Sequence, residues 1–302
     1  MIFGRTLRNM LRKKLKLDPI GSAKCIAATQ HNSETNNDVT HDNHKPNDGH
    51  LSEQSNSSIA EQLLKLELDL NESLKKLIFK KPVEYVYYPL EYAFKPHSAF
   101  VKKYCKTPKK ILFLGMNPGP WGMCQTGIPF GEVKIVKEWF EIDEEVFKPE
   151  QECPEREVLG LACPRSEVSG QRIWGLFRNI CGTPENFFKS SFMFNYCPIA
   201  MLKGNGGNIT PSEIKGETQR QLEEICDETL FDVIQLLQVE ILVGVGKFAE
   251  KRALEVLKRN NPLNTKVLYL VHPSPRVANN QNWMVTAEKK LTEFNLMSYF
   301  KN

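Results

Sequence analysis

ILFLGMNPGPWGMCQTGIPFGE, residues 111–132, is the stretch that decides the fold, because it joins an apolar run to a polar loop. Its first four residues have the length and composition of a buried parallel strand. The glycines and prolines that follow end any regular element. Ligands of open α/β sheets bind at the carboxyl ends of strands, so Asn117 at this point indicates a site. A structural turn in which Asn117 caps a helix is the alternative.

Apolar runs of strand length recur along the chain and alternate with segments of helical periodicity. Further strands are expected at residues 192–196, 241–245 and 267–271, and helices at 133–140, 171–181, 212–237, 248–258 and 283–294. This alternation predicts an α/β fold of three layers, with a central four-stranded parallel sheet and helices on both faces. Asn117, Asn195 and His272 then fall at carboxyl ends of strands, on one rim of the sheet.

The N-terminal part of the chain differs in composition from the rest. Residues 1–17 carry six Lys/Arg around an apolar helical face, which is typical of a nuclear-targeting or DNA-tethering arm, a mitochondrial presequence or a solvated tail. Residues 31–58 are polar and predict a disordered linker. Ser58 and Glu61 form a capping box ahead of leucines at helical spacing. We therefore expect a tail over residues 1–57 and a folded domain over residues 58–302.

Composition limits the partners of this domain. The 302 residues are 41% hydrophobic, enough for a packed core. Outside the first 17 residues, 34 basic residues face 36 acidic ones, so any nucleic-acid site must be a local patch. No apolar run approaches the roughly 18 residues of a membrane helix, which predicts a soluble protein without a membrane partner. The eight cysteines contain no C-x-x-C pair, which favours reduced thiols over a metal site or a disulfide framework.

A lysine-rich segment precedes the first expected strand of the sheet. Six lysines and no acid lie between Lys95 and Lys110, interleaved with Phe100 and Tyr104. A run of this kind is either a solvated face or a phosphate contact, and the sequence leaves both open.

Four motifs, in order, resemble those of the single-strand-selective monofunctional uracil-DNA glycosylases of the uracil-DNA glycosylase superfamily. They are GMNPGPWGM (115–123), TGIPFGE (126–132), FNYCP (194–198) and HPSPR (272–276), within a similarity that covers about residues 85–296. The resemblance implies that residues 58–302 form a catalytic domain of the uracil-DNA glycosylase fold. It implies a base-excision repair enzyme that flips out uracil, and 5-hydroxymethyluracil, and leaves an abasic site.

The same resemblance implies the setting in which the enzyme works. Its partner would be uracil-containing DNA, single- or double-stranded, and the protein would act as a monomer with no cofactor and no metal. Its location would be the nucleus, or the mitochondrion if the basic N-terminal segment is a presequence.

The resemblance also implies roles for individual residues. Asn117 would orient a water toward the anomeric carbon; since an amide is no useful base at neutral pH, the reaction would be mainly dissociative. His272 would donate a hydrogen bond to uracil O2 as negative charge develops. Asn195 has the donor and acceptor that match uracil O4 and N3–H. The pocket would be completed by the ring of Phe130 and by backbone amides near Met116 and Gly119.

The loop that follows His272 resembles the wedge with which the family enters duplex DNA. Its residues are Pro273, Ser274, Pro275, Arg276, Val277, Ala278 and Asn279. It differs from the family pattern in lacking an Asn-Pro pair and in being one residue shorter.

Two other functions remain open at this level. A mismatch-specific thymine/uracil glycosylase of the same superfamily would be recognised by its activity on T·G against U·G duplexes. A non-catalytic DNA-binding protein of this fold would have no need for a water-orienting amide, so Asn117 argues against it. No lysine lies in residues 115–132 or 272–282, which argues against lyase activity.

Overall fold

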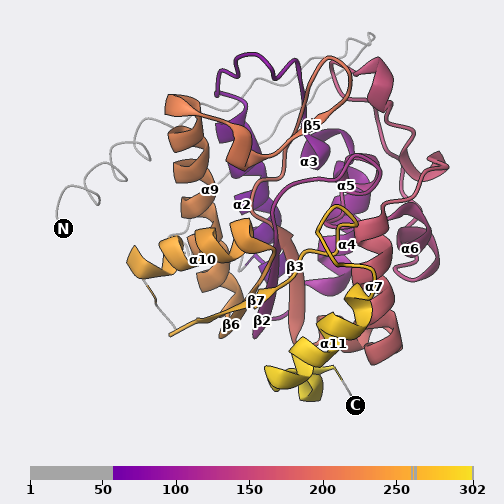
Figure 1. Cartoon of the computed structure of the whole chain (residues 1–302), viewed down its shortest axis with the longest axis vertical. Helices are drawn as coiled ribbons and strands as arrows, with labels where there is room; N and C mark the ends of the chain where they lie inside the picture. The colour runs from indigo at the N-terminus through magenta and orange to yellow at the C-terminus, as the bar shows by residue number, and fades with distance from the viewer. Residues whose placement is uncertain (1–56, 260, 262–263, 301–302) are drawn as a thin grey trace, which may run out of the picture. The chain divides into compact units, whose positions relative to one another are not determined.

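Four parallel strands in the order β3-β2-β6-β7 form the central sheet of the computed structural model, which describes residues 57–259, 261 and 264–300 (Figure 1). The strands are β2 (Ile111–Gly115), β3 (Ser191–Asn195), β6 (Ile241–Val245) and β7 (Lys266–Leu270). β2 lies between two neighbours and all its residues are buried, which explains its uniformly apolar run. The predicted four-stranded parallel sheet is confirmed.

Helices cover both faces of this sheet, as the alternating pattern predicts. They are α2 (Ile59–Leu74), α3 (Pro89–Tyr92), α4 (Phe94–Tyr104), α5 (Met123–Thr126), α6 (Val133–Glu138), α7 (Val168–Cys181), α8 (Pro184–Phe188), α9 (Gly216–Leu237), α10 (Lys247–Arg259) and α11 (Trp283–Glu293). Short 3₁₀ turns occupy Pro154–Arg156, Gly160–Ala162, Pro211–Glu213 and Met297–Tyr299. In Figure 1, α2, α9 and α10 lie on one side of the sheet, and α6, α7 and α11 on the other.

Two helix starts test the capping rules. α2 begins after Ser58, whose hydroxyl accepts from Glu61 N at 3.3 Å while the Glu61 carboxylate accepts from Ser58 N at 2.8 Å, so the predicted capping box is confirmed. The predicted helix start at Ser212 is wrong. A capping box of Thr210 and Glu213 closes a single 3₁₀ turn there, and α9 begins only at Gly216.

A second, antiparallel sheet was not predicted. Its strands, in the order β1-β4-β5, are β1 (Tyr85–Tyr87), β4 (Ala200–Leu202) and β5 (Asn208–Ile209). Strands of two or three residues are too short to show a periodicity. β4 begins five residues after Asn195, so the chain enters this small sheet soon after the carboxyl end of β3.

A cluster of aromatic side chains fills the space between the parallel sheet and α7. It includes Phe100, Phe113, Phe140, Trp174, Phe177 and Phe187, all buried. Trp174 also donates its indole N–H to the carbonyl of Pro129 at 3.3 Å. This hydrogen bond ties the aromatic core to the TGIPFGE turn.

The C-terminal end of the lysine-rich segment does not lie at the rim formed by the strand ends. Lys109 is buried and donates to the carbonyl of Phe188, and Lys110 pairs with Glu240 at 3.3 Å. Both residues precede β2, at the opposite edge of the sheet. These two lysines therefore have structural contacts at that edge. Phosphate contact by the rest of the segment stays a prediction.

Residues 1–56, with the expected amphipathic helix and nearly all of the expected linker, lie outside the described residues. Among those that are described, no helix has both the length and the apolarity needed to cross a membrane.

Candidate active site

Two neighbouring strands end side by side at the rim, and a glycine leaves room between their side chains. Gly115 ends β2 in register with Asn195, which ends β3. A Cβ added to Gly115 would lie 2.2 Å from Oδ1 of Asn195 and 2.8 Å from Cε2 of Phe130. Since no side chain tolerates such contacts, only glycine allows the amide and the ring to converge here.

Asn195 presents a buried carbonyl oxygen that has no hydrogen-bond partner among the described residues. The residue is 4% exposed, and its Nδ2 donates to the sulfur of Met123 at 3.1 Å. Because a thioether accepts but cannot donate, this contact fixes the amide with Oδ1 turned away from the sulfur. In the part of the chain that the structure describes, Oδ1 is buried without a hydrogen bond. Such an atom costs about 1–3 kcal/mol unless a ligand satisfies it.

His272 lies two residues beyond the end of β7 and is held as a neutral donor. Its Nδ1 accepts from the backbone N–H of Ser274 at 3.1 Å, so the neutral ring carries its proton on Nε2. Burial lowers the pKa of His272 to about 4. Gly246, at φ +97°, packs against it, with a hypothetical Cβ 3.3 Å from that of His272. At neutral pH the site therefore offers an N–H donor without a positive charge.

This protonation state predicts the pH dependence of the reaction. For this group we expect kcat on a uracil-containing single strand to stay level from about pH 8 to about pH 5.5, and to fall only toward the lowered pKa of about 4. In that acid range the ring would become charged, and its Nδ1 could no longer accept a hydrogen bond from the N–H of Ser274. The measurement is a pH profile of single-turnover rates.

The matched control for this profile is His272→Gln, which keeps an N–H donor but cannot titrate, so the inflection near pH 4 should disappear. A wild-type rate that increases as the pH falls from about 7 to about 5 would show that the imidazolium is the working form.

The stability of the fold should depend on the protonation of the same group. Between the ordinary pKa of 6.5 and about 4, the unfolded chain binds a proton that the folded chain does not, so stability declines as the pH falls through this window.

Phe130 is presented by a backbone conformation that side chains rarely adopt. Its φ is +53°, and a Cβ on Gly170 of α7 would lie 2.3 Å from its carbonyl oxygen, so α7 packs closely against this turn. The ring is half-buried, with its centroid 5.9 Å from that of His272 and its plane tilted by 43°. The turn thus directs one aromatic face toward the space that Gly115 leaves open.

Asn117 lies two residues beyond Gly115 and keeps its amide almost unengaged. Within the described residues its side chain has one long hydrogen bond, from Nδ2 to the carbonyl of Pro118 at 3.4 Å. It is half-buried, so a water molecule can reach it. Met116 and Gly119 flank it in the same loop, and the carbonyl of Met116 accepts from Cys197 N at 2.9 Å, which ties the loop to the residues after β3.

Glu167 belongs to this site although no sequence pattern marks it. Its Oε2 accepts from Trp121 N at 3.3 Å and lies 2.5 Å from a Cβ that would be added to Gly119. Burial raises the pKa of Glu167, while the N–H of Trp121 and the charge of Arg276 act in the opposite direction. Glu167, the residue before α7, thus interacts with the loop that contains Asn117, through Trp121 N, and with the expected wedge, through the charge of Arg276. A lone glutamate in an irregular segment gives no signal that could have found it.

A buried pair of side chains, His97 and Glu67, supports the turn that carries Phe130. His97 lies between the Gly127 carbonyl, at 2.8 Å from Nδ1, and the Glu67 carboxylate, at 2.7 Å from Nε2. Burial works against charge on this ring, but Glu67 and the two hydrogen bonds outweigh it, and the pKa of His97 is raised. Sequence analysis found His97 in the folded part but assigned it no function.

The loop after His272 has a fixed base and an exposed tip. The Asn280 amide donates to the carbonyls of His272 and Ser274 at 2.9 and 2.8 Å, and the Trp283 indole donates to that of Val271 at 2.7 Å. Arg172 donates to the carbonyl of the buried Pro273. The exposed tip consists of Pro275, Arg276, Val277, Ala278 and Asn279. The loop is short, but its fixed base leaves the tip exposed, as insertion into DNA requires.

The described part of the chain holds no group of three or more His, Cys, Asp or Glu that could bind a metal ion. Its seven cysteines are buried free thiols. What converges at the rim is a neutral imidazole N–H, a carboxamide with an unpartnered oxygen, an aromatic face and a second, unengaged carboxamide. These groups fit a flat, neutral heterocycle with both donors and acceptors on its edge, together with a water molecule.

Comparison with known proteins points the same way. The sequence model of the Uracil DNA glycosylase superfamily matches residues 102–296. The single-strand selective monofunctional uracil DNA glycosylase of Bos taurus is 49% identical over 241 residues, covering 80% of this chain and 88% of the relative. The Mus musculus protein of the same name is 48% identical, with 80% and 86% covered. The crystal structure of Pedobacter heparinus SMUG2 shares the fold, with a TM-score of 0.56 at 18% identity over 79% of this chain and 98% of that one.

Proposed function

Because the chain belongs to the uracil-DNA glycosylase superfamily and, within it, to the single-strand selective monofunctional uracil-DNA glycosylases, we propose that it releases uracil from DNA by hydrolysing the glycosidic bond of a flipped-out nucleotide. This is the chemistry of a glycosidase in base-excision repair. The abasic strand is left intact because the motif loops contain no lysine to act as a lyase.

The unpartnered carbonyl oxygen of Asn195 carries this proposal. It needs a donor, and uracil N3–H is one, while uracil O4 accepts from the amide nitrogen. The Met123 sulfur holds the amide in the orientation that suits this pairing. Phe130 supplies the face on which the base stacks.

Bond cleavage then draws on the two remaining polar groups. As the bond to the base lengthens, negative charge gathers on uracil O2, and the Nε2–H of His272 donates to it. The sugar becomes an oxocarbenium-like cation, so a water that the Asn117 amide orients needs little activation. The neutral state of His272 suits this role, since a charged ring would already be satisfied by solvent or phosphate before the reaction.

The finer aspects of the substrate are also part of the proposal. The exposed tip from Pro275 to Asn279 supports contact with the strand around the flipped nucleotide, in single-stranded and in duplex DNA. Backbone groups near Met116 and Gly119 complete the pocket. Release of 5-hydroxymethyluracil rests on the resemblance of the four motifs alone.

We further propose a monomer that acts in the nucleus, since a single chain supplies every group of the site and the substrate is DNA. The alternative location is the mitochondrion, which depends on the basic residues of positions 1–17. Fluorescent tagging of the full chain and of a chain without these residues would decide between the two.

The test uses an oligonucleotide with one uracil, incubated with the protein and divided before and after hot alkali. We expect free uracil to appear in both halves and strand cleavage only after alkali. Cleavage without alkali would show a lyase, and no release of uracil would overturn the proposal. Parallel substrates carry 5-hydroxymethyluracil, or thymine opposite guanine, to test the finer specificity.

A further inference from the structure

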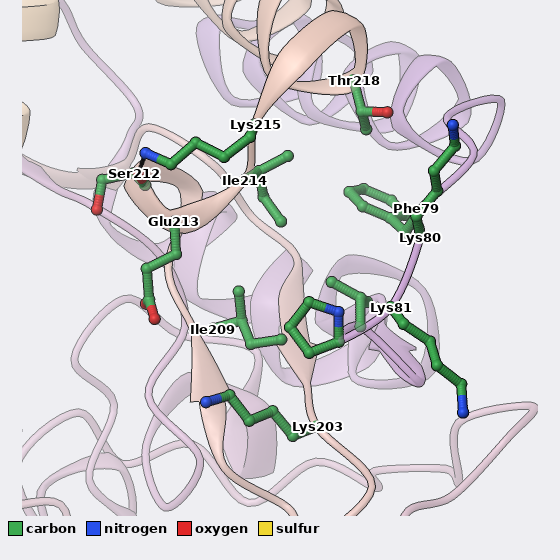
Figure 2. Close-up of a pocket in the computed structure, with 12 residues that line it drawn as sticks. Phe79, Lys80, Lys81, Lys203, Ile209, Ser212, Glu213, Ile214, Lys215 and Thr218 are labelled. Atoms are coloured by element: carbon green, nitrogen blue, oxygen red, sulfur yellow. Dashed lines mark hydrogen bonds between the residues drawn. The ribbon is translucent and has the colours of Figure 1, made fainter.

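A cavity of about 550 Å³ has a lining that does not include Asn117, Asn195 or His272 (Figure 2). It forms where the segment after α2 meets β5 and the start of α9. Its apolar lining includes Phe79, Pro82, Val83, Ile209 and Ile214. Its charged lining includes Lys80, Lys81, Lys203 and Lys215. We call it the lysine pocket.

The four lysines surround an apolar centre. Figure 2 shows the Phe79 ring facing Ile214 and Ile209, with the ammonium groups of the lysines around the periphery. Within the part of the chain that the structure describes, none of the four forms a salt bridge, and Lys215 donates only to the carbonyl of Ser212. Nine other described lysines are engaged with carboxylates. The pocket therefore gathers four ammonium groups that form no salt bridge with the described part of the chain.

The one acid of the pocket is already engaged. Glu213 accepts from the backbone N–H and the hydroxyl of Thr210, both at 2.8 Å, and these bonds lower its pKa. Lys203 and Lys215 act on it only at longer range. Excess positive charge around an aromatic ring and aliphatic side chains is complementary to a chain of phosphates that carries flat bases. An acidic peptide would use the charge but not the ring.

The position of the pocket along the chain ties it to the active site. Lys203 lies eight residues after Asn195, which limits the distance between them to about 29 Å of extended chain. At the spacing of one phosphate per about 3.4 Å of strand, that is no more than about nine nucleotides, and fewer in a stretched strand. A strand with its uracil beside Asn195 can therefore reach the lysine pocket.

We propose that the lysine pocket binds the single-stranded DNA that flanks the target nucleotide. This rests on the proposed function, because it places the uracil of the same strand in the active site. The lysines contact phosphates, and Phe79 stacks with a base. A single strand bends toward such a pocket more readily than a stiff duplex does, so the pocket favours single-stranded substrates.

The test compares two full-length variants of equal charge. One replaces Lys80, Lys81, Lys203 and Lys215 by alanine. The control replaces Lys106, Lys189, Lys258 and Lys266, which are exposed, lack salt bridges among the described residues and lie at the opposite edge of the parallel sheet. Binding is measured by fluorescence anisotropy with a uracil-free single strand of about 25 nucleotides at several salt concentrations. Thermal melting confirms that both variants fold.

We expect the pocket variant to bind the long strand at least about tenfold more weakly at about 50 mM salt, with the slope of log Kd against log salt reduced by about 2 to 3. The control variant should change both quantities much less. Changing the same four lysines to arginine should preserve binding, and Phe79→Leu should weaken it without changing the salt slope. Equal losses in the pocket and control variants would overturn the proposal, as would polyglutamate competing as well as DNA.

Activity separates a failure of this inference from a failure of the proposed function. With a uracil-containing strand of about three nucleotides, which has one nucleotide on either side of the uracil, wild type and pocket variant should give the same kcat and KM. With the long strand the pocket variant should lose the KM advantage and keep kcat. Absence of excision by wild type on either length would contradict the proposed function, whereas excision with no length dependence would contradict the lysine pocket alone.

Discussion

Asn117→Ala is expected to lower kcat on uracil-containing single-stranded DNA by two or more orders of magnitude and to leave DNA affinity nearly unchanged. Among the described residues the Asn117 amide makes only one hydrogen bond, a long one, so its removal costs the fold little. The loss falls on water placement, which matters only in the chemical step, and therefore appears in kcat rather than in KM. Single-turnover rates and anisotropy on the same oligonucleotide measure the two quantities separately.

Asn186→Ala is the matched control, since Asn186 of α8 donates to the carbonyl of Cys181 at the C-terminal end of α7, at a distance from the rim. This change should reduce thermal stability and leave kcat within a factor of about two. If Asn117→Ala retained the wild-type rate, the water would be oriented by another group and Asn117 would only shape the loop.

Asn195→Asp is expected to lose most uracil excision and to gain weak but detectable cytosine excision. Cytosine offers an N3 acceptor and an N4 donor where uracil offers N3–H and O4. The wild-type amide, held by Met123, would face cytosine with like groups at two positions, each costing about 1–3 kcal/mol. A carboxyl group accepts from the cytosine N4 donor, and it no longer supplies the fixed N–H that uracil O4 requires.

The measurement for Asn195 is base release from matched oligonucleotides that differ only in uracil or cytosine at one position. Asn195→Ala serves as the control and should release neither base, because it has no polar group for either edge. If Asn195→Asp kept the wild-type ratio of uracil to cytosine, the base edge would be recognised elsewhere. Asn195 would then be a structural residue, despite its unpartnered oxygen.

Sequence alone was sufficient for the elements that bury a continuous apolar surface. β2 and β6 read as uninterrupted apolar runs because both have neighbours on each side. Their carboxyl ends then had to share an edge with Asn195 and His272, so the rim was predictable before its distances were known. The small sheet was not predictable, because β5 is only two residues long and its pairing depends on contacts remote in sequence.

Within the site, side chains in recognisable motifs were found and their supports were not. Glu167 contacts the Asn117 loop across a sequence separation of 46 residues, counted to Trp121, and nothing local marks an acid that acts in this way. The tautomer of His272 is likewise a property of the turn, since it depends on where the N–H of Ser274 points. Such features arise from tertiary geometry, which a linear pattern does not contain.

The left-handed backbone of Phe130 lowers the stability of the fold at the active site. Glycine adopts φ +53° without strain, whereas a residue with a side chain pays about 1–2 kcal/mol. The ring is half-buried, so it recovers only part of that cost by packing. With respect to backbone strain alone, glycine would be the more favourable residue at this position. A phenylalanine at this position is therefore a trade of stability for function, because it accepts backbone strain in order to place an aromatic face where a flat base can stack.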